Sequence, residues 1–211
     1  MVQLPLFEPV PGHAPLADDE WGRLAYRPGL VPVATARRWF DELRRAVRWN
    51  AERRWMYDRQ VDVPRLTAHF RLQPAPDQPA PPAAALEAAE RVIAETGVAF
   101  DSVGLNLYRD GRDSVAPHND HLDEIAPGFP IALLSLGSTR RMTIRAKPPR
   151  RRVIHLDLEA GSLLLMSYET QLHYTHGVPK TTEPVGERIS LALRVKPKEQ
   201  AAGRASGGDR Y

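Results

Sequence analysis

The amino-acid sequence predicts an α+β fold that is mainly β, with two helices packed against one antiparallel sandwich or barrel. Two early segments carry apolar residues at helical spacing. From Ala99 onward, short β-branched and apolar runs recur every 8–14 residues between Gly, Pro and Asp, which is typical of antiparallel sheets. These runs are Val103–Tyr108, Ile131–Leu136, Met142–Arg145, Val153–Leu158, Ser162–Ser167, Leu172–Val178 and Arg188–Val195.

Each predicted helix has a start or stop signal. The first should begin at the N-cap Thr35 and run to about Trp49. Its apolar positions are Ala36, Trp39, Phe40, Leu43 and Val47. The second should run from about Ala83 to Thr96 and stop at Gly97, because glycine readily adopts the left-handed conformation that ends a helix. Its expected buried face carries Leu86, Ala89 and Ile93.

The segments around these helices have weaker signals. Residues 1–30 are rich in proline, so we expect an extended arm lying over the body. Residues 53–72 alternate irregularly around Pro64 and should form short strands and loops. Residues 73–82 are a proline-rich linker. After Pro197, small and charged residues predict a disordered tail.

The composition limits the class of protein. A chain of 211 residues with 42% hydrophobic residues can form one globular domain. No apolar run approaches the roughly 20 residues needed to span a bilayer, and the N-terminus lacks a signal-peptide pattern. We therefore expect a soluble, cytoplasmic protein without a membrane partner, and by default a monomer. Because the chain has no cysteine, any metal must be bound by His, Asp or Glu.

The basic residues are clustered. Nine arginines and five acidic residues lie between Arg37 and Arg65, among several aromatic residues. Seven Lys or Arg and no acidic residue lie between Arg140 and Arg152. Basic stretches of this kind suit a polyanion such as nucleic acid. The alternative is a set of solvated charges in an arginine-rich protein.

His118 and Asp120 form a candidate metal site. On a strand, side chains at i and i+2 project from the same face, so an imidazole and a carboxylate could share one ion. One more histidine would complete a two-histidine, one-carboxylate set with three open positions, as in non-haem iron(II) oxygenases. A His-x-Asp pattern by itself often arises by chance.

The third ligand has to come from another histidine. We favour His176, because Gly177 and Pro179 end its strand at a sheet rim where a side chain can face a cavity. His173 lies on the same predicted strand. The remaining candidates are His13, His69 and His155. A single histidine is more commonly an ordinary core or surface residue.

The last predicted strand alternates strictly between polar and apolar residues. Arg188, Ser190, Ala192 and Arg194 share one face. Buried guanidinium groups require anionic partners, and a dicarboxylate co-substrate would supply one. At about 3.3 Å per residue the two arginines lie about 20 Å apart, so one should hold the distal carboxylate and the other should serve near the metal, pairing with Asp120. An edge strand with both arginines in water is the alternative.

These residues, in this order, resemble the AlkB family of 2-oxoglutarate- and iron-dependent nucleic-acid dealkylases. The resemblance covers about residues 99–196, with a weaker echo at Tyr57 and Val63–Arg65. The matching pieces are Asn106–Gly111, His118–Asp120, Ala126–Gly128, Gly161–Met166, Tyr174–Gly177 and Arg188–Arg194. Several such pieces in register are far more specific than His-x-Asp.

The resemblance implies a double-stranded β-helix (jelly roll) with N-terminal helices packed on it and a nucleotide-recognition lid. Within one structural domain, residues 1–98 would form the arm, helices and lid, residues 99–196 the catalytic core, and residues 197–211 the disordered tail. The implied reaction is oxidative dealkylation of N-alkylated bases in DNA, with RNA left open. It would use Fe(II), O2 and 2-oxoglutarate and release succinate, CO2 and an aldehyde.

The resemblance also implies roles for single residues. It casts His118, Asp120 and His176 as iron ligands. The implied 2-oxoglutarate contacts are Asn106, Tyr108, Arg188, Ser190 and Arg194, with Ser190 where relatives often have Asn.

Such an enzyme extrudes its target base and stacks it between flat side chains. The candidates for this are Trp55, Tyr57, His69 and Phe70, and core packing is the alternative for Trp55 and Phe70. Tyr57 corresponds most nearly to a wedge residue. The basic run 140–152 would contact phosphates.

Two departures from the family concern the substrate. His121 and Leu122 follow the metal Asp where nucleic-acid members carry acidic residues, and His155 replaces an arginine. We therefore expect an altered base-reading pocket that includes His121 and His155. A 2-oxoglutarate- and Fe(II)-dependent hydroxylase or demethylase of a protein or small molecule is the second hypothesis. A non-catalytic nucleic-acid binder is the third.

Overall fold

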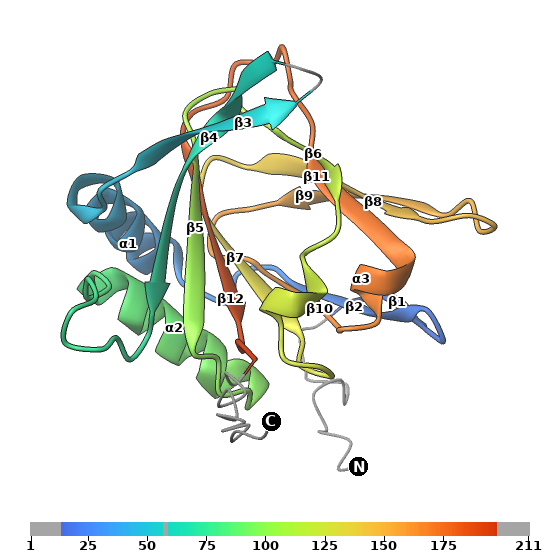
Figure 1. Ribbon diagram of the computed structural model, residues 1–211, viewed down its shortest axis with the longest axis horizontal. Coiled ribbons are helices and arrows are strands. Elements are labelled where there is room, and N and C mark those ends of the chain that lie inside the picture. Colours follow the sequence, from blue (N-terminus) through green and yellow to red (C-terminus); the bar gives the residue numbers. More distant parts are fainter. Residues whose placement is uncertain (1–13, 57–58, 198–211) are drawn as a thin grey trace, which may run out of the picture.

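The computed structural model describes residues 14–56 and 59–197. In this part of the chain, antiparallel strands form two sheets (Figure 1). The larger has the order β1 (Ala14–Asp19), β2 (Gly22–Arg27), β10 (Leu163–Met166), β7 (Ile131–Gly137), β12 (Arg188–Arg194), β5 (Ser102–Tyr108), β4 (Arg59–Arg71) and β3 (Asn50–Met56). The smaller has the order β6 (Val115–His118), β11 (Tyr174–Val178), β8 (Arg140–Ala146) and β9 (Val153–Leu158). The described helices are α1 (Val33–Ala46), α2 (Ala83–Thr96), a 3₁₀ turn at Leu122–Glu124 and α3 (Thr170–His173).

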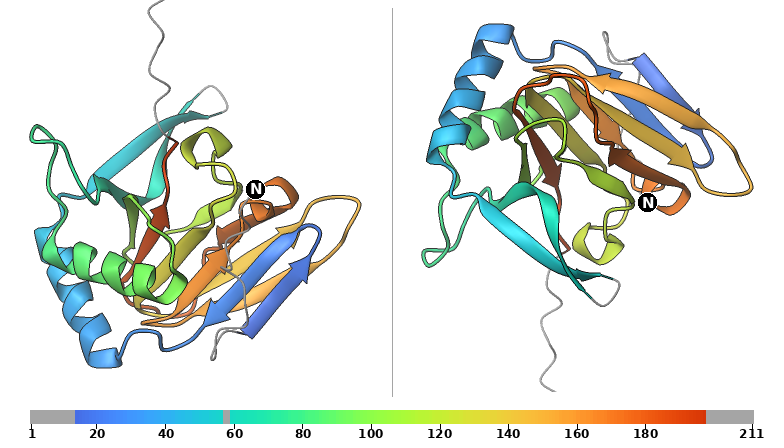
Figure 2. Two further views of the ribbon diagram at one scale, coloured as in Figure 1. Left: turned by 90° about the horizontal axis from the view of Figure 1, so that it is seen from below. Right: turned by 90° about the horizontal axis from the view of Figure 1, so that it is seen from above.

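Strand alternation divides the core into two layers. On β12, Ile189, Leu191 and Leu193 point toward α1 and α2, which cover the outer face of the large sheet (Figure 2). Ala192 points the other way, into a second cluster between the two sheets. Residues of opposite parity on one strand therefore serve different layers. The predicted mainly-β α+β fold with packed helices is confirmed.

The helix predictions are partly right. Helix α2 and its left-handed C-cap Gly97, with φ of 69°, lie where they are predicted. Of its predicted buried face, Ala89 is buried, whereas Leu86 and Ile93 are only partly buried. The face that packs against the sheet consists mainly of small residues, which let the helix approach closely. This face is Ala84, Ala85, Ala88, Ala89 and Val92. The predicted N-cap Thr35 is also wrong: Pro32 is the N-cap of α1, and its carbonyl accepts the Ala36 N–H at 2.9 Å. Proline fixes φ close to a value that a helix start tolerates.

Two predictions for the N-terminal half are wrong. Residues 14–27 of the predicted arm form the hairpin β1–β2, which extends the large sheet by pairing β2 with β10 and buries Leu24 and Tyr26. Residues 59–71 form one long strand that runs through Pro64. Proline is tolerated here because β4 pairs with β5 only from Leu66 onward, beyond Pro64.

The late strand is shorter than predicted. Residues 170–173 form α3, so β11 begins at Tyr174 and His173 is helical. Among the described residues, no helix combines the length and apolar character needed to cross a membrane.

Gly161 lies very close to the segment that precedes α1. Gly161 has φ of +77°, and a Cβ there would lie 2.3 Å from the Val31 carbonyl oxygen. We expect Gly161→Ala to lower the free energy of unfolding by about 2–5 kcal/mol, because left-handed strain adds to a backbone clash. Gly29→Ala is the matched control: φ is +61° and a Cβ would meet nothing within 4 Å, so only the conformational cost of about 1 kcal/mol should appear. Urea unfolding measures both, and equal losses would contradict the close approach.

Candidate metal centre and co-substrate cavity

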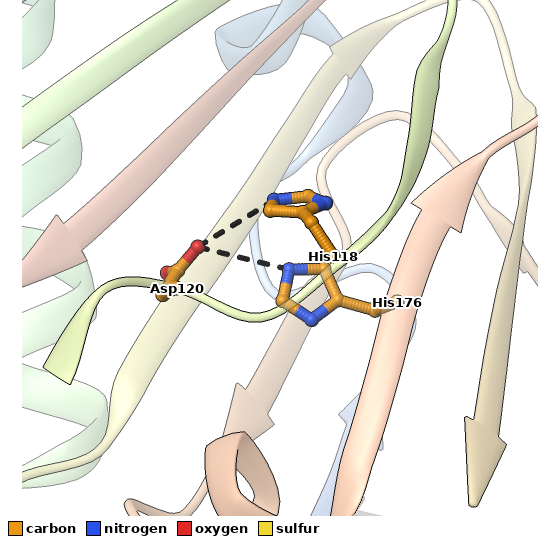
Figure 3. Close-up of side chains that lie close together, drawn as sticks. All are labelled: His118, Asp120 and His176. Atoms are coloured by element: carbon orange, nitrogen blue, oxygen red, sulfur yellow. Dashed lines mark ion pairs between the residues drawn. The ribbon is translucent and has the colours of Figure 1, made fainter. Parts of the chain in front are cut away.

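Three side chains from different segments converge between the sheets (Figure 3). His118 ends β6 and is paired in register with His176 on β11, which brings their ring centroids to 4.5 Å. Asp120 lies just beyond β6, with Oδ1 at 3.6 Å from Nε2 of His118 and 3.9 Å from Nε2 of His176. Ligand atoms of all three lie within 4.8 Å of one another, a spacing that one metal ion can bridge.

The protonation states also suit a metal. Burial lowers the pKa of His176 to about 4, so its imidazole is neutral at pH 7. Burial raises the pKa of Asp120, but the adjacent His118 ring and the charge of Arg194 outweigh it and hold this pKa well below its usual range. His118 Nδ1 lies 3.0 Å from the Ala116 carbonyl, so a proton on Nδ1 leaves Nε2 free as a ligand. Two imidazole nitrogens and a carboxylate form the donor set typical of non-haem Fe(II).

Arg194 orients the carboxylate. Its Nε and Nη2 donate to Oδ2 of Asp120 at 3.0 and 2.6 Å. This leaves Oδ1 facing the two histidines. The sequence expectation that one arginine of the last strand pairs with Asp120 therefore agrees with the contacts.

Arg188 has a different environment at the other end of β12. It is fully buried, and Nη2 donates to the Ser135 hydroxyl at 2.8 Å. Within the described part of the chain, its Nε and Nη1 have no hydrogen-bond partner. Burial lowers the pKa of Arg188, although the nearby Tyr108 hydroxyl opposes this. A buried guanidinium with two unpartnered nitrogens requires an anion, and a carboxylate would supply it.

A cavity of about 50 Å³ connects these elements. Its walls include the three candidate ligands and the five predicted co-substrate contacts, namely Asn106, Tyr108, Arg188, Ser190 and Arg194. The residues present therefore fit a metal ion and a dicarboxylate in one cavity.

Sequence reasoning missed two arginines near this cavity. Arg65 donates from Nε to Oδ1 of Asn106 at 2.8 Å and lines the cavity. Arg140 is buried, lies 5.6 Å from the Tyr108 ring and donates to the carbonyls of Asp110, Asp113 and Pro179. Arg140 lies on the same face of β8 as the apolar residues Met142 and Ile144, and this spacing is the sequence signal that could have predicted its burial.

Other residues of the basic run have partners within the chain. Arg141 pairs with Asp157 at 2.9 Å. Arg150 pairs with Asp19 at 2.9 Å and with Glu20 at 2.7 Å. The first pair joins β8 to β9, and the pairs of Arg150 join this hairpin to the β1–β2 hairpin. Phosphate binding by the run stays a prediction.

A wider groove of about 1050 Å³ opens beside the metal ligands. His69, Phe70 and His121 line it, as predicted for substrate contacts, and Phe70 also packs against the core. A Cβ added to Gly104 would lie 3.2 Å from His69 Nδ1 and 3.4 Å from Arg194 Nη1. The absence of a side chain at this position therefore lets both residues approach the sheet.

Other predicted residues lie elsewhere. His155 is exposed on β9, with Nδ1 3.3 Å from the Thr143 hydroxyl and outside both cavities, so its prediction as a substrate contact is wrong. His173 stacks on Trp21 at 5.0 Å and is no candidate ligand. Tyr57, His13 and the side chain of Trp55 lie outside the described residues.

Residues 23–194 match the family described as the 2OG-Fe(II) oxygenase superfamily, and the chain belongs to this superfamily. Membership implies Fe(II), 2-oxoglutarate and O2 as metal, co-substrate and oxidant. Its similarities to named relatives identify it further as an AlkB-like dioxygenase.

Two relatives and one solved structure illustrate this. The chain is 38% identical to human "DNA oxidative demethylase ALKBH2" over 112 residues, which are 50% of this chain and 43% of the relative. It is 31% identical to the Bos taurus "Alpha-ketoglutarate-dependent dioxygenase alkB homolog 3" over 188 residues, 82% of this chain and 65% of the relative. The chain thus spans less than two thirds of either relative. The structure titled "The structure of OsALKBH1" shares the fold, with a TM-score of 0.59 at 13% identity, covering 86% of this chain and 100% of that one.

Proposed function

We propose that this protein is a 2-oxoglutarate- and Fe(II)-dependent dioxygenase that removes alkyl groups from N-alkylated bases in DNA, with RNA as a further substrate class. The single observation that carries the proposal is one cavity that joins the His118, Asp120 and His176 cluster to the buried, incompletely bonded Arg188. The relatives named as DNA demethylases support nucleic acid as the substrate.

His118, Asp120 and His176 would hold the iron through two imidazole nitrogens and Oδ1 of the carboxylate. When bound, iron and 2-oxoglutarate supply the oxidation: O2 converts 2-oxoglutarate to succinate and CO2 and hydroxylates the alkyl carbon, which then leaves as an aldehyde. Arg194 keeps Oδ2 of Asp120 bonded, so the carboxylate cannot rotate freely.

Arg188 would hold the distal carboxylate of 2-oxoglutarate through a nitrogen that has no partner here, either Nε or Nη1, together with the adjacent Nη2. Tyr108 and Ser190 line the same cavity and would contact that end of the co-substrate. Leu133 and Ile131 form an apolar part of the cavity wall, which would lower the local polarity and strengthen the ionic contact.

The target base would enter through the wider groove. Its volume of about 1050 Å³ exceeds that of the enclosed cavity of about 50 Å³, so the two compartments suit ligands of different size. Asn106 and Arg65 line both compartments and lie at their junction. His69 and His121 would face the incoming base, and Arg71 and Lys196, which pair with Asp101 and Glu124, line the same groove.

The proposal predicts repair of methylated oligonucleotides. With Fe(II), ascorbate and 2-oxoglutarate, the protein should convert 1-methyladenine or 3-methylcytosine to the unmodified base with one formaldehyde per repair, as mass spectrometry and a formaldehyde assay would measure. His176→Ala, which loses a ligand, is the inactive control. Succinate formation without repair of either base or of an etheno adduct would refute the DNA substrate and leave the oxygenase intact.

His121 favours a second candidate, a hydroxylase or demethylase of a protein or small molecule. It is exposed in the groove directly after Asp120 and presents an imidazole to the substrate. Succinate formation that responds to another compound and not to oligonucleotides would favour this activity. We further propose a cytoplasmic monomer, which cell fractionation and sedimentation would test.

A further inference from the structure

The loop that carries Asp120 is bound to the segment that carries His176. The side-chain amide of Asn119 donates to the carbonyl of Gln171 and, at 2.5 Å, to that of Tyr174. Gln171 belongs to α3, and Tyr174 starts β11. Because Asp120 lies beyond the end of β6, strand pairing does not fix its position. The side-chain contacts of Asn119 hold this part of the loop instead.

Gln171 makes the contact nearest to the metal ligand. Its side chain is 2% exposed, and its Oε1 accepts the backbone N–H of Asp120 at 3.1 Å. On the other side its Nε2 donates to the Thr170 hydroxyl at 3.0 Å. Gln171 therefore bridges the backbone of one ligand to the helix that leads into the strand of another.

The orientation of this amide follows from its neighbours. The Thr170 hydroxyl donates its only proton to the Ser167 carbonyl at 2.6 Å. Its oxygen can then only accept, so the NH2 end of Gln171 must face Thr170. The carbonyl end must consequently face Asp120, which matches the donor on the Asp120 backbone.

Helix α3 is itself held in place from outside. Gly22 of the β1–β2 hairpin lies so close that a Cβ there would be 2.7 Å from Cγ2 of Thr170 and 2.9 Å from the Ser167 hydroxyl. Trp21 stacks on His173 at the end of the same helix. The support of Gln171 is therefore rigid, as a group that positions another must be.

We propose that Gln171 is a positioning residue of the metal centre, which sets the distance between Asp120 and His176 through the Asp120 backbone amide. Arg194 fixes the carboxylate of Asp120 and Gln171 fixes its main chain, so two independent contacts hold one ligand. This inference rests on the proposed metal site, but it needs no assumption about the organic substrate.

Cobalt(II) binding tests the inference without catalysis. Gln171→Met has a similar length and lacks the acceptor, so Co(II) affinity should fall by about tenfold to a hundredfold and the visible absorption of bound Co(II) should change. Gln171→Glu keeps an acceptor oxygen and should restore most of the affinity. Thermal unfolding of the metal-free variants separates a local effect from a general loss of stability. Unchanged Co(II) affinity and absorption in Gln171→Met would overturn the proposal.

Two further variants complete the test. Lys147 donates to the carbonyls of Leu172 and Gln171, at 2.8 and 3.3 Å, so it contacts the same segment without touching Asp120. Lys147→Met should therefore bind Co(II) like the unaltered protein, and an equal loss there would assign the effect to the helix as a whole. Should Gln171→Met not fold, Thr170→Val removes the hydroxyl that orients the amide and should weaken Co(II) binding by a smaller factor, whereas full affinity would overturn the proposal. Equal Co(II) affinity in the unaltered protein and His176→Ala would instead refute the metal site itself.

Discussion

Arg188→Met should raise the 2-oxoglutarate concentration for half-maximal turnover by about a hundredfold or more, because truncating one partner of a buried ion pair costs about 2–5 kcal/mol. The affinity for iron should change little, since Arg188 contacts none of the three candidate ligands in the hydrogen bonds and ion pairs described. Titration of turnover against 2-oxoglutarate, and of Fe(II) at saturating co-substrate, measures the two effects. Unchanged dependence on 2-oxoglutarate would contradict the role of Arg188.

Stability gives an independent check on the same variant. Without 2-oxoglutarate, Arg188→Met should unfold at the same or a higher temperature, because a buried guanidinium with two unpaired N–H groups is costly. Added 2-oxoglutarate with metal should raise the Tm of the unaltered protein but not of the variant. Arg141→Met is a suitable control, because Arg141 is exposed and pairs with Asp157 on the outer surface of the small sheet.

Asp120→Ala should abolish turnover and leave the fold largely intact. The substitution removes the only carboxylate of the candidate ligand set and frees Arg194, which then places an uncompensated positive charge beside the metal position. Both effects disfavour a cation, so activity should fall below detection and Co(II) affinity should fall sharply.

The control for this variant is Asp123→Ala, because Asp123 is exposed in the 3₁₀ turn three residues further on. Its turnover and Co(II) affinity should equal those of the unaltered protein. Far-ultraviolet circular dichroism would show whether Asp120→Ala keeps its strands. Measurable turnover by Asp120→Ala would contradict the assignment of Asp120 as a metal ligand.

Some features were accessible from the sequence because their physics is local. Gly97 ends α2 because glycine tolerates a positive φ, and this holds wherever the helix packs. The alternation of Arg188, Ser190, Ala192 and Arg194 places them on one face of β12, because side chains on a strand alternate by geometry. The choice of His176 over His173 also agrees with the structure, since only His176 approaches Asp120.

Other features depended on contacts between distant segments. Arg140 reads as a surface charge in the basic run, but the carbonyls that surround it come from residues 110, 113 and 179. In the sequence, Leu24 and Tyr26 resemble residues of an extended arm. They are buried because β2 pairs with β10. No sequence pattern around Gln171 predicts its contact with Asp120, which lies 51 residues earlier in the chain.

The sequence by itself thus determined the metal-binding residue types, the shared face of Arg188 and Arg194 on β12 and the end of α2, because bond geometry and conformational preference act over a few residues. The expected placement of His118 and Asp120 on one strand is wrong, because β6 ends at His118. The tertiary structure alone decided which charges are buried, which edge receives the N-terminal hairpin and what holds Asp120 in place. Burial and hydrogen-bond partnership are properties of neighbours in space, and the chain brings those neighbours together only when both sheets have formed.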